Sequence, residues 1–224
     1  MIRMKKYPPI TAEILNKWLT KFLNGFSCWS LRIYCRIRYN YKIVGGQNYR
    51  LASQFKASGG FILASNHQAF LDIPLLVASL PAQYFVAFMA KQELFSKPLG
   101  NWFFSNSGTI SVNRAQLEKS TIKAAKEALE TPNWVMAIFP EGTRDGDGAV
   151  ASVKGGTTFI SKLCKAPILP AGIAIANKGK GFRPKVFVVL KPPISLEAEE
   201  TMEDYTARFQ QVLQQAREEA YALL

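Results

Sequence analysis

The chain has 224 residues, 48% of them apolar, a length that fits one large domain with a substantial core better than two domains. Its single histidine and three cysteines, none in a C-x-x-C pair, argue against a transition-metal site or a disulfide framework, and point to a reducing cytosol. The 28 Lys and Arg against 16 Asp and Glu give a net charge of +12.

This positive charge is concentrated at the N-terminus. Residues 1–50 hold ten Lys and Arg and one acid, Glu13, whereas residues 193–224 hold seven acids and two arginines. A basic end of this kind is expected to meet an anionic surface such as lipid headgroups or nucleic acid.

Apolar residues recur at steps of three and four from Thr11 onward, which is the mark of one helical face. They are Leu15, Leu19, Phe22, Phe26, Trp29, Ile33 and Ile37. Gly25 is expected to divide the segment into two helices. The interspersed basic and aromatic residues are typical of a helix that lies in a membrane interface. A core helix with a solvated basic face fits the periodicity equally well.

After Tyr39, short strand-like runs alternate with helical ones, which predicts an α/β fold with a mostly parallel central sheet flanked by helices. We place a boundary near residue 40, with residues 1–40 as a basic amphipathic helical membrane-association segment that precedes a single domain, residues 41–224. The longest charge-free run, residues 73–90, contains Pro74 and Pro81 and does not read as a spanning helix. Any membrane contact is therefore predicted to be peripheral or monotopic.

The stretch FILASNHQAFLD, residues 61–72, leaves a strand and enters an apolar helix. A five-residue offset in one helix sets side chains about 140° apart, so His67 and Asp72 can touch only if His67 precedes the helix. The pair would then act as a general base with an orienting carboxylate. The alternative is a helix cap at Asn66 with an incidental histidine.

Three further stretches lie in predicted strands or directly after them. In AIFPEGTRDGDG, residues 137–148, exposed N–H groups, a hydroxyl and a guanidinium favour a phosphate site, and the alternative is an ordinary turn with a surface arginine. In SGTISVNR, residues 107–114, a short strand is expected to bring Arg114 to the same sheet edge, and the alternative is a solvated arginine at the rim. ILPAGIA, residues 168–174, carries Pro170, which argues for an edge strand or a bulge. The run LGNWFF, residues 99–104, fits the wall of an apolar tunnel, a second membrane contact or a core helix.

Together NHQAFLD, GTISVNR, FPEGTR and ILPAGI resemble the four blocks of the 1-acyl-glycerol-3-phosphate acyltransferases, over about residues 40–195. The resemblance implies that residues 41–224 form an acyltransferase domain with His67 as catalytic base and Asp72 as its orienting partner. It also implies a set of residues that hold the acceptor's glycerol phosphate: Arg114, Glu141, Gly142, Thr143 and Arg144, with Lys154 as a further phosphate contact. Ser111, Val112 and Asn113 depart from the family's usual second block, which bears on acceptor selectivity.

The expected reaction is transfer of a fatty acyl group from acyl-CoA or an acyl-carrier protein to lysophosphatidic acid, forming phosphatidic acid. The thioester is a co-substrate, and no cofactor or metal is expected. Alternatives are another lysophospholipid or lyso-lipid acceptor, or a non-catalytic lipid-binding module. The expected partners are an anionic membrane at its cytoplasmic face, the acceptor and the donor, and no nucleic acid, because no reader motif is present.

Overall fold

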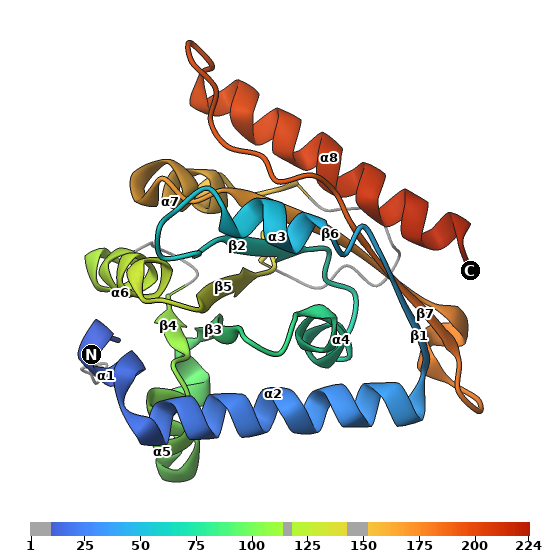
Figure 1. Ribbon diagram of the computed structural model, residues 1–224, viewed down its shortest axis with the longest axis horizontal. Helices are drawn as coiled ribbons and strands as arrows, with labels where there is room; N and C mark the ends of the chain where they lie inside the picture. The colour runs from blue at the N-terminus through green and yellow to red at the C-terminus, as the bar shows by residue number, and fades with distance from the viewer. Residues whose placement is uncertain (1–9, 114–117, 143–151) are drawn as a thin grey trace.

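The computed structural model describes residues 10–113, 118–142 and 152–224 (Figure 1). In these residues seven strands form one sheet in the order β1-β7-β6-β2-β5-β3-β4. All neighbours are parallel except β6 and β7, which confirms the predicted mostly parallel α/β fold. The strands are β1 Asn40–Val44, β2 Ile62–Ser65, β3 Phe85–Lys91, β4 Ile110–Val112, β5 Trp134–Ile138, β6 Ile168–Ile175 and β7 Lys185–Leu190.

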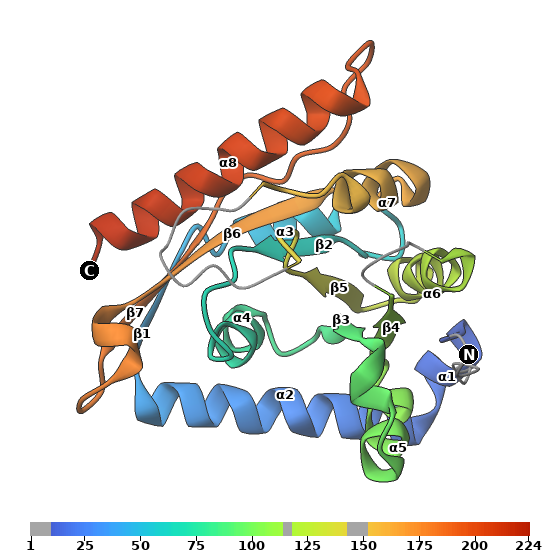
Figure 2. The same ribbon diagram turned by 180° about the vertical axis from the view of Figure 1, so that it is seen from behind.

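Helices cover both faces of this sheet (Figures 1 and 2). On one face lie α2 Trp18–Arg38, α3 Asn48–Ser53 and α4 Asp72–Ser79, and on the other lie α1 Ala12–Asn16, α6 Lys119–Glu130, α7 Gly156–Cys164 and α8 Met202–Ala222. The remaining elements are α5 Pro98–Asn106 and the short 3₁₀ helices η1 Gln92–Phe95 and η2 Ala176–Gly179. Strand side chains alternate between the two faces: in and just before β2, Phe61 and Leu63 join one core cluster, and Ile62 and Ala64 the other.

Pro170 does not mark an edge strand or a bulge, so that prediction was wrong. It lies in β6, which is flanked by β7 and β2, and it pairs with Ala64. Its carbonyl accepts a hydrogen bond from Lys191 N, one residue beyond the end of β7. The backbone N and the carbonyl of a strand residue point to the same side, so the N of Pro170 also faces the chain beyond β7. The strand β7 has already ended there, and the missing N–H therefore costs no hydrogen bond between β6 and β7.

The first long helix also differs from expectation, because α2 continues through Gly25 and the break between α1 and α2 falls at Lys17. Its inward face carries small or polar residues, including Asn24, Cys28 and Cys35. Asn24 Nδ2 donates to the carbonyls of Val86 and Ser107 at 2.8 and 2.7 Å. The helix is thus fixed to the core by polar and small side chains.

The outward face of α2 carries the aromatic and aliphatic residues. Trp18, Phe22, Phe26 and Trp29 are each at least half exposed, and they stack in succession along the helix. The core-helix interpretation of this periodicity is therefore wrong for α2, whereas Leu15, the first residue of the series, is buried in α1. The core-helix interpretation is also wrong for α5, which buries none of its residues. No helix within the described ranges combines the length and apolarity needed to cross a bilayer.

The contact between α8 and the sheet depends on Gly172 in β6. A Cβ atom there would lie 2.1 Å from the Ala216 carbonyl carbon and oxygen. We expect Gly172→Ala to lower the free energy of unfolding by about 2 kcal/mol or more, since the helix must move away from the strand. Urea denaturation measures this loss.

Gly155→Ala is the matched control, because a Cβ at Gly155 meets nothing within 4 Å and the backbone there is right-handed helical. Its free energy of unfolding should change by less than about 1 kcal/mol. Equal effects of the two substitutions would contradict the close packing of α8 on β6.

Candidate active site

Two sequence blocks meet at one sheet edge because their strands are neighbours. β2 leads into Asn66 and His67, and β5 leads into Phe139 and Pro140. The strands run parallel with Ala64 opposite Ile138, so both chains leave the sheet at the same end. In α/β sheets this carboxyl end is where binding sites form.

Asn66 fixes the exit of β2 to the neighbouring strand β6. Its Nδ2 donates to the Ile173 carbonyl at 3.1 Å, and its Oδ1 accepts from Ile173 N at 2.7 Å. The side chain thereby supplies the backbone partners that the departing strand no longer provides. Asn66 is not a helix cap, because the residue before α4 is Leu71, which makes no side-chain cap.

His67 precedes α4 and Asp72 is the first residue of that helix, as the offset required. The Nδ1 atom of His67 lies 3.1 Å from Asp72 Oδ2, and both side chains are buried. The same Oδ2 accepts the backbone N–H groups of Gln68 and Ala69 at 2.5 and 2.8 Å. The carboxylate also sits at the positive end of the helix, where negative charge is favoured.

The imidazole is further held from the β5 side. The His67 ring stacks on Phe139, with centroids 4.0 Å apart and planes 18° apart. The buried Glu141 carboxylate accepts the backbone N–H of His67 at 3.3 Å. Two residues of the FPEGTR block therefore fix the histidine: Phe139 contacts its ring and Glu141 binds its backbone N–H.

The chain turns sharply after β5. Gly142 N donates to the Phe139 carbonyl with Pro140 as the second residue of the turn, the position that a fixed proline φ favours. Gly142 has a φ of +71°, and a Cβ there would lie 3.3 Å from Lys154 Nζ. Lys154 N donates to the Pro140 carbonyl, which brings the start of α7 back to this turn.

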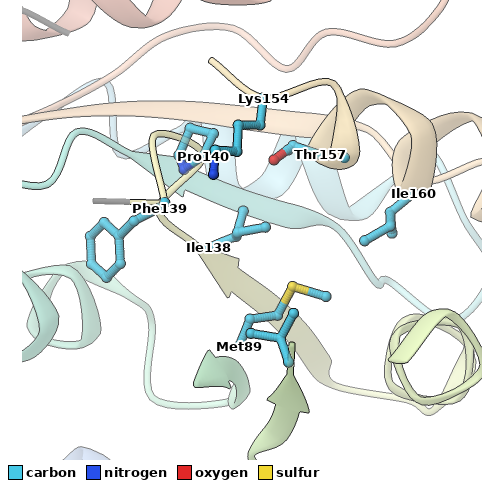
Figure 3. Close-up of a pocket in the computed structure, with 10 residues that line it drawn as sticks. Met89, Ile138, Phe139, Pro140, Lys154, Thr157 and Ile160 are labelled. Atoms are coloured by element: carbon cyan, nitrogen blue, oxygen red, sulfur yellow. The ribbon is translucent and has the colours of Figure 1, made fainter. Parts of the chain in front are cut away.

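A pocket of about 170 Å³ opens beside this turn (Figure 3). Lys154 lines the pocket from the loop before α7, and Thr157 lines it from α7 itself. Met89 lies on the opposite side. The rest of the lining is mostly apolar: Val112, Ile138, Phe139, Pro140, Gly142, Gly156 and Ile160. An ammonium group beside an apolar hollow suits a ligand with an anionic head and an apolar remainder.

The structure brings together five of the predicted site residues: His67, Asp72, Glu141, Gly142 and Lys154. Arg114, Thr143 and Arg144 lie outside the described residues, although Val112, two residues before Arg114, lines the pocket. The structure does not test the roles assigned to these eight residues, which stay predictions.

Two contacts were missed from the sequence. Phe139 was noted only as part of its block, and its stacking on His67 follows from the adjacency of β2 and β5. The hydroxyl of Tyr221, near the C-terminus, donates to Gln68 Oε1 at 2.5 Å. No sequence signal links residues 153 positions apart, so only the fold could reveal this contact.

The model of the Acyltransferase family matches residues 46–174, more than half of the chain, and the chain belongs to this family. A 1-acyl-sn-glycerol-3-phosphate acyltransferase of Bacillus subtilis is 29% identical over 156 residues, which cover 69% of this chain and 73% of the relative. The corresponding enzyme of Streptococcus pneumoniae is 29% identical over 147 residues, covering 64% of this chain and 53% of that protein.

The human alpha form of 1-acyl-sn-glycerol-3-phosphate acyltransferase is 30% identical over 126 residues, which cover 54% of this chain and 43% of the human protein. The fold agrees with a crystal structure of PlsC, a 1-acyl-sn-glycerophosphate acyltransferase from Thermotoga maritima. The two match with a TM-score of 0.67 over 94% of this chain and 86% of that one, at 24% identity. The family resemblance of the four blocks is confirmed.

We expect Asn66→Ala to lower the free energy of unfolding by about 3 kcal/mol, because the buried N–H and carbonyl of Ile173 lose their partner. Urea denaturation is the measurement, and Asn106→Ala is the control. Asn106 Nδ2 donates to the Trp102 carbonyl in an exposed hydrogen bond, so Asn106→Ala should lower the free energy of unfolding by less than about 0.5 kcal/mol. Similar losses for both variants would show that Asn66 does not fix the strand exit.

Proposed function

We propose that the protein transfers a fatty acyl group from an acyl thioester to the free hydroxyl of lysophosphatidic acid, forming phosphatidic acid. The observation that carries the proposal is the His67–Asp72 pair, buried at the sheet edge where the Phe139–Gly142 turn also lies. The names of the relatives from Bacillus subtilis and Streptococcus pneumoniae support the acceptor.

In this mechanism Asp72 engages Nδ1 of His67, so Nε2 takes the proton of the acceptor hydroxyl. The hydroxyl oxygen attacks the thioester carbonyl, the C–S bond breaks, and the thiolate leaves with the proton that the imidazolium returns. General base catalysis of this kind is worth about 10² to 10⁴ in rate. Positioning of the two substrates supplies much of the rest.

Several contacts keep the base in one orientation. Asp72 fixes the ring tautomer and stabilises the imidazolium, while the stacked Phe139 ring limits rotation of His67. The Glu141 bond to His67 N ties the base to the turn after β5. The hydroxyl and the base can then meet repeatedly in the same geometry.

The acceptor's phosphate is assigned to the turn after β5. Lys154 lies beside Gly142 at the rim of the pocket, where its ammonium would pair with a phosphate oxygen. Arg114, Thr143 and Arg144, which lie outside the described residues, are proposed to complete this site. The donor is proposed to be acyl-CoA or an acyl-carrier protein.

A thioester-consumption assay with several lyso-acceptors tests the proposed acceptor. Faster consumption with another lysophospholipid would favour that acceptor, and no consumption with any of them would favour a non-catalytic binding module.

The enzyme is proposed to work as a peripheral or monotopic protein on an anionic membrane at the cytoplasmic face. The outward aromatic residues of α2 support this, because the helix carries four Lys and Arg and no acid. Each basic residue near an anionic leaflet contributes about 1 kcal/mol. Both substrates carry acyl chains, so the lipid surface also brings them to the site.

His67→Ala is expected to lower turnover by about 10² to 10⁴-fold, because the proton acceptor is lost. Circular dichroism and vesicle binding should not change. Gln68→Ala is the control: its backbone N–H, which bonds Asp72, is retained, and most of the turnover should remain. Normal turnover without the imidazole would exclude the mechanism.

The membrane contact is tested by Phe22→Glu with Phe26→Glu on the exposed face of α2. We expect affinity for anionic vesicles to fall by more than about tenfold, because two aromatic side chains are lost and two negative charges added. Sedimentation measures the bound fraction. Gln211→Glu with Gln215→Glu adds the same charge to exposed positions of α8 and should have little effect; equal losses would place the contact elsewhere.

A further inference from the structure

A second basic and aromatic segment lies beside the C-terminal end of α2. It is the 177–185 loop, NKGKGFRPK, which runs from η2 into β7 and holds four Lys and Arg, one aromatic residue and no acid. Phe182 near its centre is 95% exposed, more than any other large apolar residue in the described chain. In both views the loop projects beside the end of α2 (Figures 1 and 2).

The exposure of Phe182 is built into the fold. Its neighbours Gly181 and Arg183 both have left-handed φ values, +90° and +44°. A left-handed arginine is strained, and such a conformation persists only where surrounding contacts hold it. The backbone on both sides of Phe182 therefore has a conformation that other contacts must hold.

The contacts that hold the loop come from α2. Arg183 Nη2 donates to the carbonyls of Arg36 and Tyr39 at 3.0 and 3.4 Å. In the opposite direction Arg38 Nη2 donates to the Gly179 carbonyl at 2.8 Å. The loop and the helix end are therefore joined, and both carry an exposed apolar side chain, Phe182 on the loop and Ile37 on α2.

The same loop also touches the segment that carries the catalytic pair. A Cβ on Gly179 would lie 3.0 Å from Leu71 Cδ1, so the loop packs closely on the residue before Asp72. Next to Leu71, Phe70 is 68% exposed. The loop thus contacts both the end of α2 and the segment that leads into Asp72.

We propose that the 177–185 loop is a second membrane anchor, in which Phe182 enters an anionic leaflet and the adjacent basic residues bind headgroup phosphates. Charge complementarity supports this occupant, because Lys180 and Arg183 stand within two residues of Phe182 in the sequence. The opposite face of the sheet carries α8, with four acids and two arginines. The inference goes beyond the proposed function, on which it rests only for the membrane setting.

The second anchor has a geometric consequence. A single amphipathic helix on a membrane can roll about its own axis, so α2 alone does not fix which side of the sheet edge faces the lipid. An anchor on a separate element, in contact with Leu71, limits the roll and holds the segment before Asp72 near the leaflet. The acceptor could then reach His67 without leaving the interface completely.

The test uses the full chain with one added thiol labelled by an environment-sensitive dye, at Phe182→Cys, at Phe22→Cys on α2, or at Gln211→Cys on α8. Cys28, Cys35 and Cys164 are buried, and burial raises the pKa of Cys28 and of Cys35 to about 11, so the added thiol reacts first. The probes are vesicles of phosphatidylcholine with phosphatidylglycerol, with and without brominated acyl chains.

We expect blue shifts and bromine quenching at positions 22 and 182 and neither at 211. A response at 22 without one at 182 would overturn the second anchor and leave the α2 contact intact. A response at 211 equal to that at 182 would overturn the proposed orientation, and no response at any position would overturn both contacts.

Phe182→Ala provides the functional arm. We expect vesicle affinity to fall about tenfold, with Phe182→Trp restoring it and with an unchanged midpoint of thermal unfolding, because the side chain is exposed. Acylation of a vesicle-bound acceptor should fall, whereas that of a monomeric short-chain acceptor should not. Unchanged vesicle affinity would refute the anchor, whereas a wild-type protein that acylates neither acceptor would refute the proposed function instead.

Discussion

The site depends on one carboxylate oxygen, Oδ2 of Asp72, which accepts hydrogen bonds from the His67 ring and from two successive backbone N–H groups. These bonds bend the chain between the end of β2 and the start of α4, so the turn and the His67–Asp72 pair are a single structure. The oxygen also stands at a helix N-terminus, which favours its negative charge. Loss of this carboxylate would therefore disturb the backbone as well as the orientation of the His67 ring.

The remainder of the sheet edge supports that turn from two sides. Asn66 bonds the backbone of Ile173 in β6, and Glu141, which follows β5, bonds the backbone of His67. Both strands flank β2, so its exit is held on each side. Distant parts of the sequence meet here only because the order β6-β2-β5 places them next to one another.

Much of this could be predicted from the sequence, because strands and helices of the α/β pattern have distinct periods and the blocks with His67 and Gly142 follow buried strands. Strand order could not be predicted, since alternating periodicity does not say which strands pair. The stacking of Phe139 on His67 and the bond from Tyr221 to Gln68 depend on that order. Pro170 was misjudged because its missing N–H falls where the β7 ladder ends.

The periodicity of α2 was recognised correctly, but it identified a face and not the direction in which that face points. A core-facing helix and an interfacial helix share the same 3.6-residue repeat, and what distinguishes them is the opposite face. In α2 the opposite face carries Asn24, which binds the Val86 backbone, and small residues such as Cys28 and Cys35 that let the helix approach closely. Packing with small and polar residues leaves the aromatic ones outward, and the segment near Phe182 is fastened to the same helix end by Arg183. The helix and the loop are thus oriented by their polar contacts with the core, which leaves their apolar side chains available to lipid.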